Sequence, residues 1–326
     1  MAYVARRSLM LVPTIFIISI LTFLIMQAPP GDFMTAYIAT REATGEQVDI
    51  EQVEALRAAY GLDQPWYEQY RIWITSFIQG DLGVSFEWNR PVTELIGQRL
   101  ALTIFISILT ILFTWFLAVA IGIYSAVYQY SPFDYLFTTI GFLGLAVPNF
   151  MLALILMFFA FKYLGVSVGG LFSSEYVNAP WSVEKFIDLL HHIWIPIIVI
   201  GTSGTASLIR VMRANLLDEL KKPYVVTAQA KGVPRWKAIF KYPVRMALNP
   251  LLSTIGWLLP AIISGDIIVS VVLSLQTIGP LYLRALQNQD MFLAGSILMI
   301  LTVLTVFGTL ISDLLLAWID PRIQYR

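Results

Sequence analysis

The sequence predicts an all-α integral membrane protein, and its composition, its long apolar segments and the charges of its loops support this prediction. Of its 326 residues, 58% are hydrophobic and 13% are charged, whereas soluble domains are about half apolar and about a quarter charged. This excess of apolar side chains suits a lipid environment. The 21 basic and 21 acidic residues balance, so nothing indicates a nucleic-acid partner. The lipid bilayer is the first partner that we expect.

Six segments are apolar enough to cross a bilayer, which takes about 20 residues of helix. We expect six transmembrane helices at Ser8–Met26, Leu100–Tyr128, Tyr135–Phe161, Ile193–Met212, Leu251–Leu275 and Phe292–Ile319. The first follows two arginines, as in a signal peptide, but it is too long for a cleaved apolar region, and "LIMQAPP" is a poor cleavage site. Residues 1–26 are therefore expected to be a retained N-terminal transmembrane helix.

The distribution of Lys and Arg predicts the orientation of these spans. With the N-terminus inside, 13 basic residues fall on the cytoplasmic side and eight on the outer side. Nine of the 13 lie between Arg210 and Arg245. Both termini are therefore predicted to be cytoplasmic.

The first loop, residues 27–98, is predicted to be extracytoplasmic and partly helical. It carries 11 acidic residues. Asp49 and Gln52 form a capping box that starts a first predicted helix, and Gly61 stops it. A second helix is expected from Pro65 to Gly80. The favoured interpretation is two short amphipathic helices on the outer membrane surface, and the alternative is that they dock an external partner. The rest of the chain, 99–326, is expected to be a five-helix core with a cytoplasmic loop at 213–249.

The phosphate-binding motif of ATP hydrolysis and the zinc-protease motif are absent from the sequence. It contains no G-x-x-x-x-G-K-[ST] or H-E-x-x-H pattern and no cysteine. Its two histidines, His191 and His192, are adjacent, and the acid beside them is Asp188. Such a pair at the end of a span is more typical of an interfacial anchor than of a metal site. We therefore expect no catalytic residues, no metal and no cofactor.

Acidic residues inside predicted spans are candidates for function. Asp266 and Asp313 are two such residues. For Asp313 we favour a structural role near the inner end of its helix, whereas for Asp266 a structural role and a cavity-facing role are equally supported. The positions that could line a translocation path are Pro148, Asn149, Ser264, Asp266 and Ser270.

The stretch "YVVTAQAKGVPRW" predicts a short docking helix on the cytoplasmic side. Pro223 suits a first helical position, the helix is expected over Tyr224–Lys231, and Gly232 supplies a left-handed stop. Val233 and Pro234 then begin a second helix toward the fifth span. The alternative is an amphipathic linker on the lipid headgroups. The predicted docking surface is Tyr224, Thr227, Ala228, Gln229, Ala230, Lys231, Gly232 and Pro234.

This segment, "PYVVTAQAKGVPRWKAIFKYPVRMALNP", resembles the EAA loop of ABC-transporter permeases. The resemblance extends over nearly the whole chain, and it is to the first (B-type) permease of the dipeptide/oligopeptide/nickel family. It is carried by the opening span with "PPGD", by "YGLDQPWYEQYRIWITSFIQGDLGVSF" and "RPVTELIGQRLALT" in the outer loop, and by "DPRIQY" at the C-terminal end.

The resemblance implies a type I ABC importer permease fold in a bacterial or archaeal cytoplasmic membrane. The implied partners are a second homologous permease, two cytoplasmic ATP-binding subunits and an extracytoplasmic solute-binding protein. ATP hydrolysis is then expected in the partners, with this chain coupled to it through residues 224–232.

Some residues depart from the family pattern, and they leave the solute open. Ser270 stands where an acid is usual, a proline follows Gly279 instead of preceding a glycine, and Gln229 replaces a common basic residue. Oligopeptides are the family's commonest cargo, but "GGLFSSEYVNAPW" and "LNPLLSTIGWLLP" resemble relatives associated with oligosaccharide uptake. Nickel and opine-like compounds are further options. Beyond this family, a secondary carrier and a membrane scaffold are the other two classes that we consider.

Overall fold

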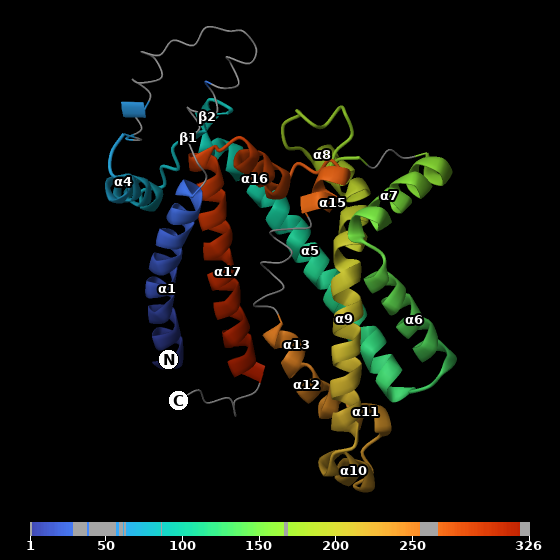
Figure 1. Ribbon diagram of the computed structural model, residues 1–326. Helices are drawn as coiled ribbons and strands as arrows, with labels where there is room; N and C mark the ends of the chain where they lie inside the picture. The colour runs from blue at the N-terminus through green and yellow to red at the C-terminus, as the bar shows by residue number, and fades with distance from the viewer. Residues whose placement is uncertain are drawn as a thin grey trace. The chain divides into compact units, whose positions relative to one another are not determined.

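The computed structural model describes residues 2–28, 38, 57–58, 61, 63–85, 87–165, 169–254 and 267–319. Most of the regular structure in these residues is helical (Figure 1). Internal contacts divide the chain into two compact units, which we describe separately. The first consists of residues 1–102 and 277–306, and the second of residues 103–276 and 307–326.

The first unit is built from helices and one short antiparallel β-pair. Its elements are α1 (Ala2–Gln27), α4 (Trp66–Ile78), β1 (Val84–Ser85), β2 (Arg90–Pro91), the beginning of α5 (Val92–Val127), α16 (Ile278–Gln287) and most of α17 (Met291–Ile319). In the β-pair Val84 is opposite Pro91 and Ser85 is opposite Arg90. Buried Ile96, Leu281 and Leu293 belong to one apolar cluster that joins α5, α16 and α17.

Aromatic rings attach α4 to α1 in the first unit. The ring of Phe23 lies 5.5 Å from that of Tyr70 and 6.0 Å from that of Trp73. The Tyr70 hydroxyl also shares a hydrogen bond of 2.8 Å with Ser19 Oγ. Helix α4 begins at Trp66, so Pro65 is the residue before the helix, whereas the prediction had made it the first helical residue. The other predicted helix of the loop, which ends before Gly61, lies almost entirely outside the described residues.

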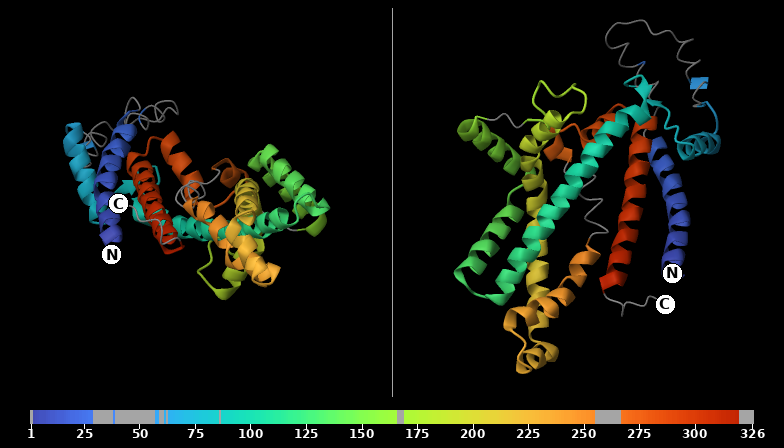
Figure 2. Two further views of the ribbon diagram at one scale, coloured as in Figure 1. Left: turned by 90° about the horizontal axis from the view of Figure 1, so that it is seen from below. Right: turned by 180° about the vertical axis from the view of Figure 1, so that it is seen from behind.

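The second unit is arranged around α9. Its elements are most of α5, α6 (Pro132–Ala146), α7 (Asn149–Phe159), the π-helix Ala160–Leu164, α8 (Val183–His192), α9 (Trp194–Leu220), α10 (Pro223–Ala230), α11 (Arg235–Lys241), α12 (Pro243–Ala247), α13 (Asn249–Ser253), α15 (Ile267–Val272) and the end of α17. Helices α6, α7, α12 and α13 all pack against α9. The views of Figures 1 and 2 agree that α6 and α9 lie side by side.

Three helices are long and apolar enough to cross a membrane, and they correspond to the first, second and sixth predicted spans. Their spanning parts are Leu9–Gln27, Val92–Val127 and Met291–Leu315. Two bent helix pairs raise the number of candidates among the described residues to as many as five. The fifth predicted span, Leu251–Leu275, includes residues 255–266, which lie outside the described part. Six spans therefore remain a prediction.

The third predicted span is not a straight helix. Between Pro132–Ala146 and Asn149–Tyr163 the helix axis turns by 107°. Val147 is extended, with φ −87° and ψ 123°. Pro148, which follows it, disfavours helical geometry in the preceding residue and has no N–H to donate. Pro148 is the signal for this break in the sequence, but the surrounding apolar segment is long enough to be predicted as one continuous span.

The fourth predicted span is longer than expected. Helix α9 continues to Leu220 instead of ending at Met212, with a bend of 52° between residues 202 and 204. The part of the 213–249 segment that lies outside α9 therefore begins at Lys221.

Candidate functional site: the segment from α10 to α12

Helix α10 is a short helix with defined ends. Pro223 is its first residue, as predicted, and Lys222 before it is extended. The helix has eight residues and ends at Ala230, so at 1.5 Å per residue it is about 12 Å long. Lys231 is the C-terminal capping residue, whereas the prediction had included it in the helix.

Gly232 ends α10 in a Schellman motif. Its φ is +76°, its N–H donates to the carbonyl of Gln229 at 2.9 Å, and the N–H of Val233 donates to the carbonyl of Ala228 at 3.1 Å. These two bonds satisfy carbonyls that the helix end would leave without partners. A Cβ at Gly232 would meet no atom within 4 Å, so the requirement for glycine comes from the backbone conformation and not from crowding.

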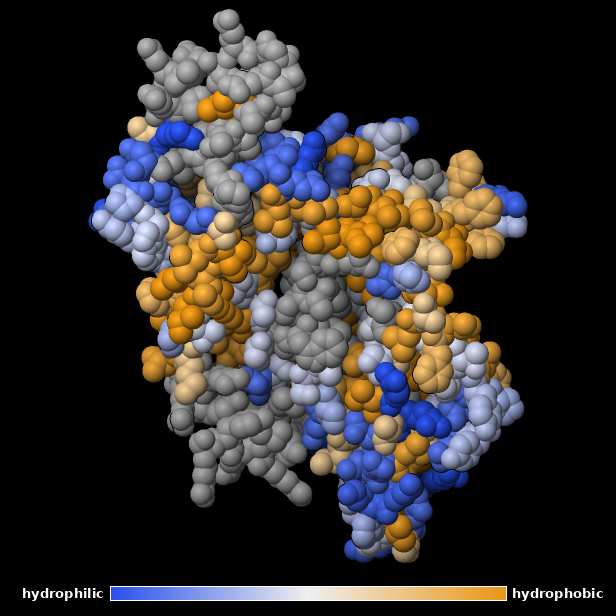
Figure 3. Space-filling view, in the orientation of Figure 1, coloured by the Kyte–Doolittle hydropathy of each residue, from blue (hydrophilic) through white to orange (hydrophobic). Residues whose placement is uncertain are grey.

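Most of α10 faces away from the rest of the second unit. Of the predicted docking residues, Thr227, Gln229, Ala230, Lys231, Gly232, Pro234 and Tyr224 are exposed, and Ala228 is half-buried. Val225 is the buried residue that holds α10 in place, with 2% of its surface exposed. In Figure 3 the end of the second unit that carries α10 and α11 is mainly hydrophilic. This end therefore presents a projection that is mainly hydrophilic but also exposes the apolar side chains of Val226 and Trp236.

A buried cluster connects this projection to the long helices of the second unit. Its members are Ile123 and Ala126 from α5, Met212 and Leu216 from α9, Ile239 from α11, Val244 and Ala247 from α12, and Leu251 from α13. Next to this cluster, Gly122 permits close contact between α5 and α9, because a Cβ there would lie 2.7 Å from Cβ of Met212. The cluster thus joins α11, α12 and α13 to both long helices by direct packing.

Tyr224 joins the start of α10 to its neighbours. Its hydroxyl donates to the carboxylate of Glu219 at the end of α9, and its ring packs edge-on against Tyr242 with centroids 6.4 Å apart. Burial, followed by the hydrogen bond to Glu219, raises the pKa of the Tyr224 phenol. The phenol therefore remains a protonated donor at neutral pH.

The helix that follows Pro234 is interrupted, contrary to the prediction of one helix into the fifth span. Helix α11 ends at Lys241, Tyr242 has φ −118° and ψ −75°, and α12 starts at Pro243. Pro243 has no N–H with which to continue the α11 hydrogen bonds, and its ring crowds the preceding turn. The segment is a chain of three short helices, α11 to α13.

The structure describes three of the five residues of the predicted translocation path. Pro148 is exposed at the α6–α7 break, and Asn149 begins α7. Ser270 is buried, in α15, which packs against α7 and α9. Ser264 and Asp266 lie outside the described residues, so the role of these five positions remains a prediction.

The two histidines have different surroundings. His191 is exposed, whereas His192 is buried, with Nδ1 2.8 Å from the carbonyl of Asp188 and 3.6 Å from its carboxylate. Within the described part of the chain, no group of three His, Cys, Asp or Glu residues could hold a metal ion. Asp313 is half-buried in α17 and has an interaction partner.

Sequence reasoning missed two buried carboxylates with structural roles. Asp134 pairs with Arg213 between α6 and α9. Asp290 is fully buried, accepts hydrogen bonds from the Ser85 hydroxyl and from the N–H groups of Glu87 and Leu293, and caps α17. The available signal for Asp290 was its place directly before an apolar run, which is typical of a helix cap.

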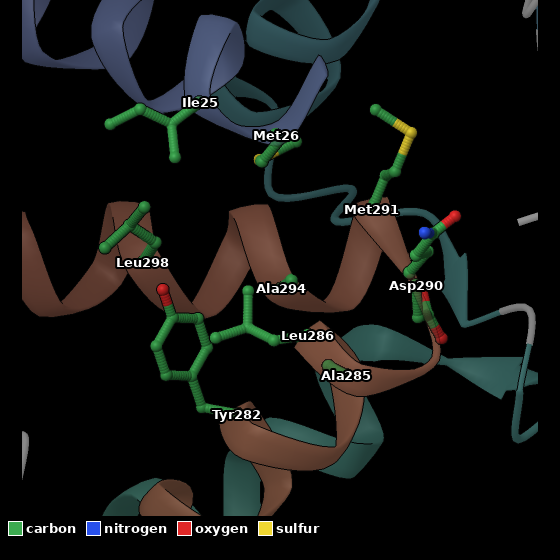
Figure 4. A pocket seen from close by; sticks show the side chains of 10 residues that line it. Ile25, Met26, Tyr282, Ala285, Leu286, Asp290, Met291, Ala294 and Leu298 are labelled. Carbon is green, nitrogen blue, oxygen red and sulfur yellow. The ribbon is translucent and has the colours of Figure 1, made fainter. Parts of the chain in front are cut away.

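A small apolar cavity lies beside Asp290 in the first unit. Figure 4 shows Ile25 and Met26 of α1 opposite Tyr282 and Leu286 of α16, with Ala294 of α17 between them. Its volume is about 60 Å³, well below the roughly 300–1,000 Å³ of small-molecule pockets. It is too small for an oligomeric solute and represents imperfect packing of three helices.

Comparison with known proteins agrees with this architecture. Residues 118–325 match the family "Binding-protein-dependent transport system inner membrane component", and residues 1–108 match its N-terminal family model. The chain is 36% identical to the oligopeptide transport system permease protein AppB of Bacillus subtilis, over 99% of both chains. It is 30% identical to the dipeptide transport system permease protein DppB of Alkalihalophilus pseudofirmus over the full length of both, and 30% identical to the glutathione transport system permease protein GsiC of Escherichia coli O6:H1 over 99% of both.

The two family models together match nearly the whole chain, and the similarity to full-length permeases is continuous. The apolar helices of the structure are those of a multi-pass membrane protein. The chain therefore belongs to the permeases of binding-protein-dependent ABC transporters, in the family that serves dipeptides and oligopeptides.

Proposed function

We propose that this chain forms half of the translocation pathway of an ATP-driven importer and that α10 couples it to cytoplasmic ATPases. The observation that carries the proposal is the attachment of α10. It is capped and mostly exposed, and the helices after it share a buried core with α5 and α9. An isolated helix of eight residues is too short to be stable in water. A projection of this kind is suited to insertion into a groove on a partner.

In the proposed mechanism, α10 acts as a rigid connection between two conformational states. Closure of the ATPase dimer on ATP would displace α10, and the shared core would carry the displacement to α5 and α9. A ligand at one end shifts the population of states at the other only if it binds the two states with different affinity. ATP and the loaded solute-binding protein would supply that difference, while this chain itself hydrolyses nothing.

The proposed complex contains a second homologous permease, two ATP-binding subunits and an extracytoplasmic solute-binding protein, with both termini of this chain in the cytoplasm. The names of the similar permeases refer to oligopeptide, dipeptide and glutathione transport. An oligopeptide-type solute is therefore the first candidate. Oligosaccharides are the second, because of the sequence around Gly169–Trp181 and Leu248–Pro260.

The composition of the complex can be tested by purifying it through this chain from its own membranes and measuring its mass by native mass spectrometry. We expect a second permease and two ATPase chains, and the mass of the ligand on any bound solute-binding protein should distinguish a peptide from a sugar. Uptake into proteoliposomes should then require ATP on the side of the membrane that carries α10, whether that side is inside or outside the vesicle. Uptake without ATP would support a secondary carrier, and partner binding without any uptake would support a scaffold.

A further inference from the structure

A cavity of about 270 Å³ lies between α6 and α9 in the second unit. The two helices are antiparallel neighbours: Asp134 near the start of α6 pairs with Arg213 near the end of α9, and a Cβ at Gly141 would lie 3.7 Å from Cβ of Ala206. The small residues at this second point hold the helices close while leaving room beside them. Both walls belong to candidate membrane spans.

The lining of the cavity changes from polar to apolar along its length. Tyr130 and Arg213 line the end near the start of α6, and Arg210 lines the cavity about one turn of α9 further in. Phe142 and Leu145 line it about two to three turns from the start of α6. Tyr130 and Tyr135 are exposed, and tyrosines are enriched where a membrane meets water. The cavity thus has a polar end that suits a lipid headgroup and an apolar end that suits an acyl chain.

The charge at the polar end is positive. Both side-chain oxygens of Asp134 are engaged by Arg213, through Nε at 3.1 Å and Nη2 at 2.9 Å, so these two charges compensate each other. Arg210 lies one turn earlier on α9 and also lines the cavity, and its side chain is exposed. No ion pair of Arg210 is found among the described residues. One guanidinium without an ion-pair partner among the described residues therefore lines an otherwise mainly apolar groove.

We propose that this groove binds one anionic phospholipid, with its phosphate-containing headgroup at Arg210 and part of an acyl chain along Phe142 and Leu145. Arginine pairs well with phosphate because its planar donors match the oxygen geometry. Basic pockets between transmembrane helices bind anionic headgroups on the same physical grounds. The acyl chain would fill apolar space that water would occupy at a cost. A lipid held there would occupy the groove between α6 and α9, beside the Asp134–Arg213 ion pair.

The test uses the full chain purified with its co-purifying subunits, depleted of lipid in detergent and titrated with phosphatidylglycerol or phosphatidylcholine while native mass spectrometry counts bound lipids. The unmodified chain should retain phosphatidylglycerol in preference to phosphatidylcholine. Arg210→Gln should weaken phosphatidylglycerol binding about fivefold, which is ~1 kcal/mol, and should remove the preference. Lys237→Gln removes an exposed cation of α11 that does not line the groove, and it should leave binding unchanged.

A second variant tests the apolar part of the site. Ala214→Leu places a larger side chain at an exposed position of the lining and should reduce the binding of both lipids, whatever their headgroup. Inorganic phosphate at the same concentration should not displace the lipid. Displacement by phosphate alone would overturn the acyl-chain part of the proposal, and unchanged lipid retention in both Arg210→Gln and the groove-filling variant would overturn it entirely.

A third outcome distinguishes a protein occupant from a lipid. If photo-crosslinking from position 138, which lines the groove, captures another subunit of the complex and no lipid, the groove is a subunit interface and the lipid proposal is wrong. None of these results depends on ATP-driven uptake, so failure of the lipid proposal leaves the proposed function intact.

Discussion

Arg213 of α9 and Asp134 of α6 form a two-point ion pair, with Nε 3.1 Å from Oδ1 and Nη2 2.9 Å from Oδ2. The Asp134 carboxylate also accepts from the N–H of Tyr130 at 2.9 Å, and Ser131 caps the helix start by accepting from the N–H of Asp134 at 3.2 Å. The side chain of Asp134 is 3% exposed and that of Arg213 is 27% exposed. One carboxylate therefore holds the turn before α6, the start of α6 and the end of α9 together.

Replacing Arg213 should cost more stability than replacing Asp134. Arg213→Ala leaves a buried carboxylate without its cation, and we expect a loss of about 3 kcal/mol. Asp134→Ala leaves a guanidinium that can reach solvent, so its loss should be smaller. Thermal unfolding midpoints of both single variants and the double variant, at one scan rate, measure this. A double variant as unstable as the sum of the singles would show that the pair is not coupled.

Replacing Gly232 should separate folding from coupling. Gly232→Val forces a β-branched residue into φ +76°, and left-handed geometry costs non-glycine residues about 1–2 kcal/mol or more. We expect a folded chain whose ATP-driven uptake falls severalfold, because the end of α10 changes direction. Gly232→Asn is the matched control, since asparagine tolerates this region, and its uptake should stay near normal. Normal uptake by the valine variant would contradict the coupling role of α10.

Asp290 should make stability depend on pH. Burial raises the pKa of its carboxyl, although hydrogen bonds from Ser85, Leu293 and Glu87 act in the opposite direction. The folded chain therefore binds more protons than the unfolded chain between the ordinary and the raised pKa, and stability falls as pH rises through this window.

The comparison with Asp290→Asn isolates this effect, because asparagine also caps helices but does not titrate. The unfolding midpoint of the unmodified chain, relative to that of Asp290→Asn, should decrease as pH rises from 4 to 8. A difference that stays constant over this range would show that Asp290 titrates alike in both states. Asp290→Ala should be less stable than Asp290→Asn by about 1 kcal/mol at any of these pH values, since it loses the cap.

Two glycines of α5 should respond oppositely to substitution. A Cβ at Gly122 would lie 2.7 Å from Met212, whereas a Cβ at Gly97 would meet nothing within 4 Å. Gly122→Val should therefore cost about 1–3 kcal/mol through overpacking of the cluster beneath α10. Gly97→Ala should be neutral or stabilising by up to ~1 kcal/mol, because alanine favours a helix interior. Unfolding midpoints measure both, and equal effects would contradict the close packing of α5 on α9.

The α10 segment shows how far local sequence signals reach. The proline start, the glycine stop and the small residues between them predicted α10 to within one residue at its end. These signals depend on backbone sterics, which act over only a few residues. The residue types at the helix ends therefore suffice to predict where the helix begins and ends. The same holds for the first, second and sixth apolar helices, whose length alone is informative.

The sequence by itself determined the membrane character, the family and the position of α10. Only the tertiary structure decided that α5, α9 and α11 share a core, that Asp134 meets Arg213 and that Asp290 is buried beneath the β-pair. The partners in these contacts are separated by 79 and 205 residues in the two hydrogen-bonded pairs. Such contacts depend on which faces of distant helices meet, and no local pattern of hydrophobicity or capping specifies that choice.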